Sequence, residues 1–355
     1  MRKVGKEIGF LATDEACSRN GEGAFIRLRS GAILLIYTAY VTKDWHDDGE
    51  SVLAAIRSYD EGESWEACGE IVRPTAHACN VMSVSLLRMA NGDIGLFYLQ
   101  KCKRGGHVMD EYLLRRSHDE GESWEEPTVC IPPNGYVVVN NDRVVRLKSG
   151  RILIPVATHW PTASPGVASV FYSDDDGVSW KESNRLYPPY AHDKAGLQEP
   201  GVIELPDGRI RLWMRTELGF QFEAFSEDGG ISFGSPCPNL FFTSPCSPMQ
   251  MKRVGDYTVA IFNPVPNSRP LMGEGPFWRS WWGRTPFVCA VSEDGGLTFP
   301  RTYYIEDDPR NDYCYPAILE GEEGFLLSYY HSNGTPICLN SLKLVKVAYR
   351  EIAAK

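Results

Sequence analysis

A motif of eight residues that recurs five times along the chain constrains the fold more than any other feature. Its pattern is Ser-x-Asp-x-Gly-x-(Ser/Thr)-(Trp/Phe), and the copies begin at Ser58, Ser117, Ser173, Ser226 and Ser292. The aspartate accepts hydrogen bonds from the N–H groups of a tight turn, and the glycine adopts a positive φ. An enzyme rarely needs five active sites, whereas every unit of a repeat protein needs its own turn. The pattern therefore predicts structural turns rather than catalytic or metal-binding aspartates.

A second repeat, out of phase with the first, consists of a glycine turn that leads into an apolar run. Six copies centre on Gly31, Gly92, Gly150, Gly208, Gly255 and Gly324. Short apolar runs between glycine-rich turns are typical of hairpin strands, and two hairpins per repeat give about four strands. The two repeats together predict an all-β fold, a six-bladed β-propeller with four-stranded antiparallel blades. We expect a single propeller domain over residues 1–355.

The sixth repeat differs from the others because no octet follows residue 300. A closed ring still needs a complete sheet at this position. The run 342–349 can supply one strand, and the segment 4–11 can add the outermost one. Pairing the two ends of the chain would remove an exposed sheet edge.

Composition narrows the classes of partner. The formal net charge is −10 and no basic stripe or long run of Lys and Arg occurs, so nucleic acid is not expected as a partner. No apolar stretch approaches a membrane span, so we expect no membrane partner. The ten cysteines form no Cys-x-x-Cys pair, which predicts neither a metal site nor a cofactor. Scattered thiols and the absence of a visible signal peptide favour a cytoplasmic location, although a trimmed secreted chain would look the same.

The octet resembles the Asp-box, or BNR repeat, and the whole chain resembles the sialidase superfamily of six-bladed propellers. This resemblance implies a glycoside hydrolase of the exo-α-sialidase type that cleaves a terminal acidic sugar with retention. It also implies a Tyr–Glu nucleophile pair, an Asp acid/base and three arginines that bind a carboxylate. The expected partner is a small-molecule or glycan substrate.

Two segments carry the expected nucleophile pair. Gln198-Glu199-Pro200, followed by a turn and by Arg215 at the end of the next apolar run, is similar to a sialidase segment. By that resemblance Glu199 is the base and Arg215 the second arginine. Tyr315 lies before the last glycine turn, as the sialidase nucleophile does, with Tyr313 as the alternative. A phenol needs a neighbouring base to act as a nucleophile at neutral pH, and Glu199 would supply it.

The third arginine and the acid are located by counting back from octets. Arg284 lies eight residues before Ser292, a position similar to that of the third sialidase arginine. Arg279 and Arg269 are weaker alternatives, and the tryptophans of 278–282 could form an aromatic wall beside the site.

The acid/base candidate lies in the loop before the first octet. Asp47 and Asp48 lie eleven and ten residues before Ser58, as the sialidase acid does, and Asp47 is preferred. Proton donation requires a raised pKa, which we expect from partial burial by Trp45.

The first arginine is where the chain departs from the family pattern. The corresponding position is Gly21, and Arg19, two residues earlier, is the candidate replacement. Glu22 beside it would repel a substrate carboxylate. Because a bidentate arginine is well suited to bind a carboxylate, this departure leaves sialic acid itself in question.

Other polar residues flank the apolar runs at equivalent places and are candidate substrate contacts. His159 is the first choice among them, and ordinary capping of strand ends is the alternative interpretation. The others are His77, Asn80, Gln100, Lys101 and Asn140 to Arg143. Two further interpretations remain open: a glycosidase or lyase for a different sugar, and a carbohydrate-binding propeller without catalysis.

Overall fold

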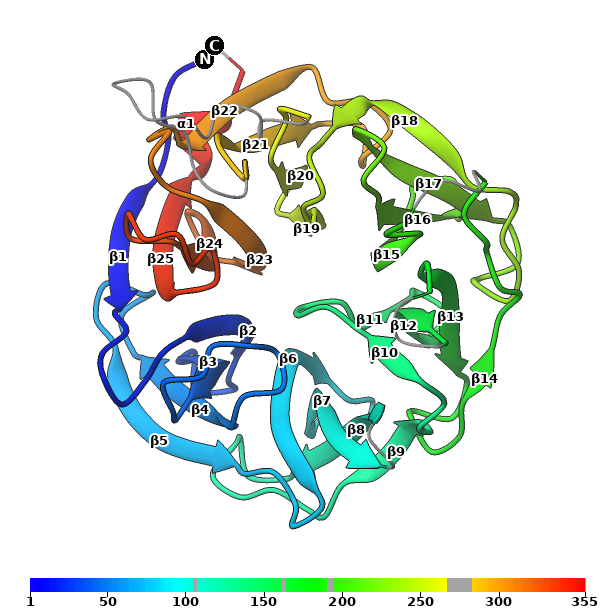
Figure 1. Cartoon of the computed structure of the whole chain (residues 1–355). Coiled ribbons are helices and arrows are strands. Elements are labelled where there is room, and N and C mark those ends of the chain that lie inside the picture. The colour runs from blue at the N-terminus through cyan, green and yellow to red at the C-terminus, as the bar shows by residue number, and fades with distance from the viewer. Residues whose placement is uncertain (105–106, 161–163, 190–193, 267–282, 355) are drawn as a thin grey trace.

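Six antiparallel sheets are arranged as blades around a central axis (Figure 1). The computed structural model describes residues 1–104, 107–160, 164–189, 194–266 and 283–354. The predicted all-β, six-bladed β-propeller is confirmed. Within the described ranges the one helix is α1 (Tyr349–Ile352), and no helix there is long and apolar enough to cross a membrane.

The strands of each blade follow one another in sequence from the axis outward, with two exceptions: β10 and β11 of blade 3 both pair with β12, and the outermost strand of blade 6 is β1. Blade 1 contains β2 (Asn20–Arg27), β3 (Ile33–Tyr40), β4 (Ser51–Ser58) and β5 (Glu66–Val72); blade 2 contains β6 (Ala78–Arg88), β7 (Ile94–Arg104), β8 (His107–Ser117) and β9 (Thr128–Ile131). Blade 3 contains β10 (Tyr136–Val138), β11 (Val145–Arg146), β12 (Ile152–His159), β13 (Val167–Ser173) and β14 (Lys181–Glu182). Blade 4 contains β15 (Gln198–Glu204), β16 (Ile210–Arg215), β17 (Phe220–Ser226) and β18 (Cys237–Thr243). Blade 5 contains β19 (Gln250–Val254), β20 (Tyr257–Phe262), β21 (Phe287–Ser292) and β22 (Arg301–Glu306). Blade 6 contains β23 (Tyr313–Glu320), β24 (Gly324–His331), β25 (Ser341–Ala348) and β1 (Lys6–Leu11).

Blade 6 is completed by the N-terminal strand, as the sequence predicted. β1 pairs with β25, and the pairing runs from Lys6 opposite Lys346 to Leu11 opposite Leu342. The two ends of the chain therefore lie together on the rim of the ring (Figure 1). This pairing covers the edge of β25 that would otherwise be exposed.

The octets form the turns between the third and fourth strands of blades 1 to 5, away from the axis. In blade 3, Asp175 accepts hydrogen bonds from Ser173 Oγ (2.8 Å), Ser179 N (2.9 Å) and Ser179 Oγ (2.5 Å). These hydrogen bonds stabilise the carboxylate and lower the pKa of Asp175 to about 2. The other four copies repeat the bonds, which confirms the structural role predicted for these aspartates.

The hydrophobic core is divided into clusters that lie between neighbouring blades rather than along the axis. One cluster, for example, joins Ile36 of blade 1 to Leu96 of blade 2. At the axis the contacts are polar: Arg143 Nη2 of blade 3 donates to Met249 O before blade 5, and Asn141 Nδ2 donates to Gly23 O of blade 1. Burying apolar side chains between blades thus leaves the centre of the ring to polar groups.

A β-bulge interrupts the innermost strand of four blades at the same height. The irregularities fall at Gly21/Ala24, Met82/Ser85, Gln198/Gly201 and Cys314/Ala317. Within each bulge one residue other than glycine has a positive φ. These residues are Glu22 (49°), Ser83 (59°), Glu199 (43°) and Tyr315 (58°). A bulge re-aims a side chain, and such strained positions cluster at functional sites.

Candidate active site

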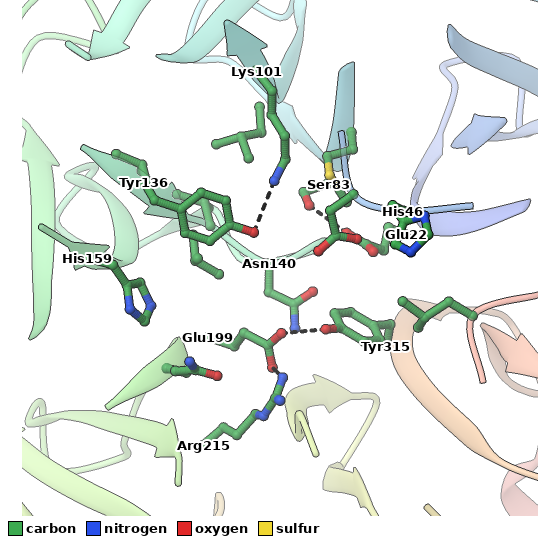
Figure 2. Close-up of a pocket in the computed structure, with 18 of the residues that line it drawn as sticks. Glu22, His46, Ser83, Lys101, Tyr136, Asn140, His159, Glu199, Arg215 and Tyr315 are labelled. Carbon is green, nitrogen blue, oxygen red and sulfur yellow. Dashed lines mark hydrogen bonds and ion pairs between the residues drawn. The ribbon is translucent and has the colours of Figure 1, made fainter. Parts of the chain in front are cut away.

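The four bulge residues meet at one cavity of about 520 Å³ at the centre of the ring. The cavity falls in the size range of small-molecule sites. Figure 2 shows Lys101, Tyr136 and His159 on one side of it and Glu199, Arg215 and Tyr315 on the other. Its remaining lining residues come from all six blades and their connecting loops. They are Glu22, Trp45, His46, Asp47, Met82, Ser83, Leu99, Val137, Val138, Val139, Asn140, Ser164, Lys194, Gln198, Arg284 and Leu339.

Tyr315, Glu199 and Arg215 form a continuous hydrogen-bonded chain in the cavity wall. Tyr315 Oη donates to Glu199 Oε1 at 2.5 Å, and Arg215 Nη1 lies 2.7 Å from Glu199 Oε2. Burial opposes ionisation of Glu199, but Arg215, together with the Tyr315 hydrogen bond and the Arg284 charge, outweighs it, and the pKa of Glu199 is lowered. Burial and the Glu199 charge raise the pKa of Tyr315 well above its usual value. Tyr315 is therefore protonated and Glu199 is ionised, so the carboxylate can accept the phenolic proton.

The alternative tyrosine lies elsewhere. Tyr313 is fully buried in the core between blades 5 and 6, where its ring stacks against Phe287. Of the two candidates, the structure brings only Tyr315 to the cavity.

Arg284 lies beside Tyr315, and its guanidinium group contacts cysteine sulfur atoms. Its guanidinium carbon is 5.7 Å from the centre of the Tyr315 ring, and its Nη1 is 3.2 Å from Cys314 Sγ. Burial opposes ionisation of Cys314, but the Cys338 thiol and Arg284 outweigh it and lower the pKa of Cys314. Arg215 also has a sulfur contact, from its Nε to Cys246 Sγ at 3.2 Å. Both arginines are thus fixed in place and line the cavity.

Asp47 lines the mouth of the cavity, but its protonation differs from the prediction. Arg19 Nη1 lies 2.6 Å from Asp47 Oδ1, and the Asp47 side chain is 49% exposed. Desolvation by the surrounding cavity wall opposes ionisation of this half-exposed carboxyl group, but Arg19, Lys101 and Arg215 together outweigh it and bring the pKa of Asp47 down to about 2. The expectation of a raised pKa is therefore wrong for the free protein. Asp48 is not among the lining residues.

Arg19 lies behind the cavity wall rather than in it. Its guanidinium contacts Glu22 Oε1 (2.5 Å), Asp47 Oδ1 and Tyr330 Oη (2.7 Å), and its side chain is 1% exposed. At Gly21, a Cβ would lie 2.0 Å from Tyr330 Cε1, so Tyr330 occupies the space that a larger residue would need. The structure therefore does not bring Arg19 to the cavity as a replacement for the missing arginine. Glu22 lines the cavity in its place.

His159 lies in the cavity wall as a neutral hydrogen-bond acceptor. Its Nδ1 is 2.7 Å from Ser164 O, and because a carbonyl only accepts, Nδ1 is the nitrogen that carries the proton. Burial lowers the pKa of His159, which keeps the ring neutral. Its Nε2 has no hydrogen-bond partner in the part of the chain that the structure describes.

The other polar candidates divide into two groups. Lys101 and Asn140 line the cavity, as does Tyr136, which the sequence did not single out. Asp142 instead accepts a hydrogen bond from Lys252 (2.8 Å), and Arg143 bonds across the axis as described above. Asn80 Nδ2 donates to Gly49 O (2.7 Å) and Gln100 Oε1 accepts from Thr75 N (3.3 Å). These four residues, like Asn141 and the exposed His77, are not among the lining residues.

Two cavity residues were missed as contacts although the sequence carried a signal for them. Glu22 lies nine residues before Gly31, as Glu199 does before Gly208. Ser83 has the same offset from Gly92, and Tyr315 has it from Gly324. In these four blades the residue nine positions before the glycine turn is therefore the bulge residue that faces the cavity. The family pattern drew attention to Gly21, one residue before Glu22, so the shared offset of Glu22 was not noticed.

Part of the expected site lies outside the described residues, namely the aromatic wall of 278–282 and the alternatives Arg269 and Arg279. Over the described ranges, no group of three or more His, Cys, Asp or Glu side chains is arranged to hold a metal ion.

Comparison with known proteins yields one family and several distant relatives. A family model described as a BNR repeat-like domain matches residues 73–327, more than two thirds of the chain. The anhydrosialidase of Macrobdella decora is 24% identical over 244 residues, which is 62% of this chain and 29% of that protein. The chain thus spans about three tenths of the length of this curated relative.

Two solved structures illustrate the likeness in fold. A protein of unknown function from Dyadobacter fermentans superposes with a TM-score of 0.74 at 19% identity, covering 97% of this chain and 99% of that one. A leech intramolecular trans-sialidase complexed with 2,7-anhydro-Neu5Ac gives a TM-score of 0.72 at 13% identity, covering 99% and 71%. At these identities the likeness concerns the fold.

Proposed function

This chain belongs to the family of BNR repeat-like domains, and from that premise we propose that it is a sialidase-type glycoside hydrolase acting on a terminal acidic sugar. The observation that carries the proposal is the chain of contacts from Tyr315 to Glu199 to Arg215 in a central cavity. A phenol hydrogen-bonded to an ionised carboxylate is the arrangement that activates a weak oxygen nucleophile. The anhydrosialidase of Macrobdella decora and the leech intramolecular trans-sialidase, both named as sialidases, support the same class of substrate.

In the first step, Tyr315 Oη bonds to the anomeric carbon and the bond to the leaving oxygen breaks. Glu199 accepts the phenolic proton, and Asp47 gives a proton to the leaving oxygen. A tyrosine suits an anomeric centre that bears a negative group, because a carboxylate nucleophile would be repelled there. In the second step, water attacks the anomeric carbon and gives a proton to Asp47, while Tyr315 departs and recovers its proton from Glu199. The configuration of the sugar is retained.

Asp47 must hold a proton in the complex, although it is ionised in the free protein. A substrate carboxylate adds a negative charge to the cavity and draws on the positive charges that now lower the pKa of Asp47. Like charge raises the pKa of a carboxyl group. The acid role of Asp47 is therefore a property of the substrate complex.

The sugar itself need not be sialic acid. Arg215 and Arg284 are available to bind a carboxylate, but Arg19 is engaged by Glu22, Asp47 and Tyr330. Glu22 adds a carboxylate to the cavity wall. A cavity that contains Glu22 and lacks the first arginine favours a second candidate: a glycosidase or lyase on the same scaffold that acts on another acidic sugar.

The test is release of 4-methylumbelliferone from a panel of sialosides and hexuronides by wild type, Tyr315→Phe and Asp47→Asn. Tyr315→Phe should lower kcat/KM by about 10³-fold or more. Asp47→Asn should affect this good leaving group little, but should lower kcat/KM for alkyl glycosides by about 10²–10⁴-fold. Tyr59→Phe, at an exposed octet tyrosine, is the matched control.

Each outcome points to one interpretation. No turnover of any glycoside by wild type would contradict the hydrolase and favour a carbohydrate-binding propeller. Turnover of a hexuronide alone would favour the second candidate, and an unsaturated product would identify a lyase. Equal rates for wild type and Tyr315→Phe would remove the tyrosine from the mechanism.

A further inference from the structure

Lys101 is a buried cation in the cavity wall to which the proposed reaction assigns no contact, although its charge helps to lower the pKa of Asp47. It lies near the end of β7 in blade 2, its residue is 2% exposed, and it lines the cavity. Figure 2 shows it across the cavity from Glu199, Arg215 and Tyr315. A buried lysine is rare unless it is paired. The groups that contact Lys101 therefore indicate its role.

The hydrogen bonds of the ammonium group are incomplete. Lys101 Nζ donates to Tyr136 Oη at 3.1 Å and lies 4.4 Å from the centre of the same ring. This is one acceptor among the described residues for a group with three N–H donors. Two donors are thus left without a hydrogen-bond partner within the described ranges.

An ion pair with Asp110 does not account for Lys101, and Asp47, whose pKa its charge helps to lower, pairs with Arg19 instead. Asp110 lies directly opposite it on β8 and is the carboxylate nearest in the pairing. Asp110 Oδ2 accepts from Val137 N (3.0 Å), while its Oδ1 has no hydrogen-bond partner in the described part of the chain. A lysine retained for this pair would bond to that oxygen, yet Nζ reaches Tyr136 instead.

The wall around Lys101 is shaped by aromatic rings. Tyr136 pairs with His159 across β10 and β12, and their ring centres are 5.8 Å apart. His159 Nε2 is an acceptor suited to a hydroxyl group. The wall therefore offers a cation and, beyond the Tyr136 ring, a neutral acceptor, on the side opposite the two arginines.

We propose that Lys101 and Tyr136 form a subsite for a second anionic substituent of the sugar, opposite the carboxylate bound by Arg215 and Arg284. The substrate class is then a sugar acid that carries a further negative group, such as a sulfate or phosphate ester. The inference rests on the proposed function for the orientation of the sugar, but it concerns binding and needs no turnover. Hydrogen bonds to a charged group in a buried site are strong enough to select such a substituent.

The experiment is calorimetric titration with free sugars: N-acetylneuraminic acid and D-glucuronic acid, each unmodified, O-sulfated and O-acetylated. The O-acetyl ester adds bulk without charge and so isolates the contribution of the anion. In at least one series the sulfated sugar should bind roughly tenfold to hundredfold more tightly than its acetylated counterpart. Phosphorylated sugars of the same series compare the two kinds of ester.

Variants assign the effect to the lysine. Lys101→Met should abolish the preference for the sulfated sugar, Lys101→Arg should retain most of it, and Tyr136→Phe should reduce it. Lys181→Met removes an exposed lysine on β14 and should change nothing. Melting temperatures show whether each variant is folded. If Lys101→Met does not fold, Lys101→Arg still allows the test.

The outcomes separate this inference from the proposed function. A sulfate preference that depends on Lys101 in a protein without hydrolase activity would support the subsite and contradict the enzyme. Hydrolysis with no gain for any sulfated or phosphorylated sugar would overturn the subsite alone. A preference that persists in Lys101→Met would overturn it as well.

Discussion

At the scale of single residues, Arg215 determines the protonation of the nucleophile pair. Its Nη1 lies 2.7 Å from Glu199 Oε2, and its charge lowers the pKa of a carboxyl group that burial alone would raise. The neighbouring phenol keeps its proton, because burial and Glu199 raise its pKa. The functional state of the pair therefore depends on a third side chain.

Replacing Arg215 with methionine should move the acid limb of the pH profile. Without the guanidinium, burial dominates and the pKa of Glu199 rises. A general base works only when deprotonated, so the acid limb of kcat/KM shifts to higher pH. The unpaired buried carboxylate should also lower the free energy of unfolding by about 3 kcal/mol. The measurements are pH–rate profiles and urea denaturation.

Arg185→Met provides the matched control, since Arg185 forms a more exposed pair with Glu182 on the outside of blade 3. It should leave the profile unchanged. An acid limb at the same pH in Arg215→Met would show that Glu199 is not the base.

At the scale of elements, the bulge in the innermost strand brings the site together. Glu22, Ser83, Glu199 and Tyr315 occupy the same place in four blades and share a positive φ. The sequence predicted the strands and their glycine turns, because apolar runs and glycines are local signals. It did not predict the bulges, because no residue type marks a non-glycine position of positive φ and the constant offset of nine residues from the glycine turns carries no conformational signal by itself. Glu199 and Tyr315 were found through the family resemblance, and Glu22 was noted only as a neighbour of Gly21.

The octet turns should make the protein sensitive to acid. The aspartates Asp60, Asp119, Asp175, Asp228 and Asp294 all have pKa values of about 2, against about 3.9 when unfolded. A lowered pKa contributes stability that is complete above the unfolded value and is lost as the pH falls through the folded one. The melting temperature should therefore fall steeply from about pH 4 to pH 2.

Asp175→Asn tests this explanation at one turn. The variant should melt at a lower temperature at pH 7 and lose less stability between pH 4 and pH 2, with kcat/KM unchanged because the turn lies far from the cavity. If Asp175→Asn loses as much stability between pH 4 and pH 2 as the wild type does, the acid sensitivity arises from other groups.

At the scale of the whole molecule, contacts between distant blades decide what the local sequence leaves open. Arg19 was predicted to enter the cavity because it is near Gly21 in the chain. Tyr330, 311 residues away, fills the space beside Gly21 and accepts a hydrogen bond from Arg19. No local pattern encodes this meeting of blades 1 and 6. The ring itself was predictable, because its six repeats are each local.

The closure of the ring provides a prediction for the whole molecule. β1 is the only strand of blade 6 that comes from the N-terminal end. Its residues from Lys6 to Leu11 pair along the outer edge of β25. Deleting residues 1–11 removes these hydrogen bonds and exposes the edge of β25. The free energy of unfolding should fall by a few kcal/mol, on the order of 1 kcal/mol per bond lost. The bare edge should also promote association between molecules.

Urea denaturation and size-exclusion chromatography measure the two effects. Lys6→Ala is the control, since it keeps the backbone of β1 and removes only an exposed ion pair with Glu63, which is worth about 0–1 kcal/mol. A truncated protein that stays monomeric with an unchanged midpoint would mean that three strands suffice for blade 6. If the truncated chain loses stability and associates while Lys6→Ala does neither, the backbone pairing of the two ends is what closes the ring around the cavity.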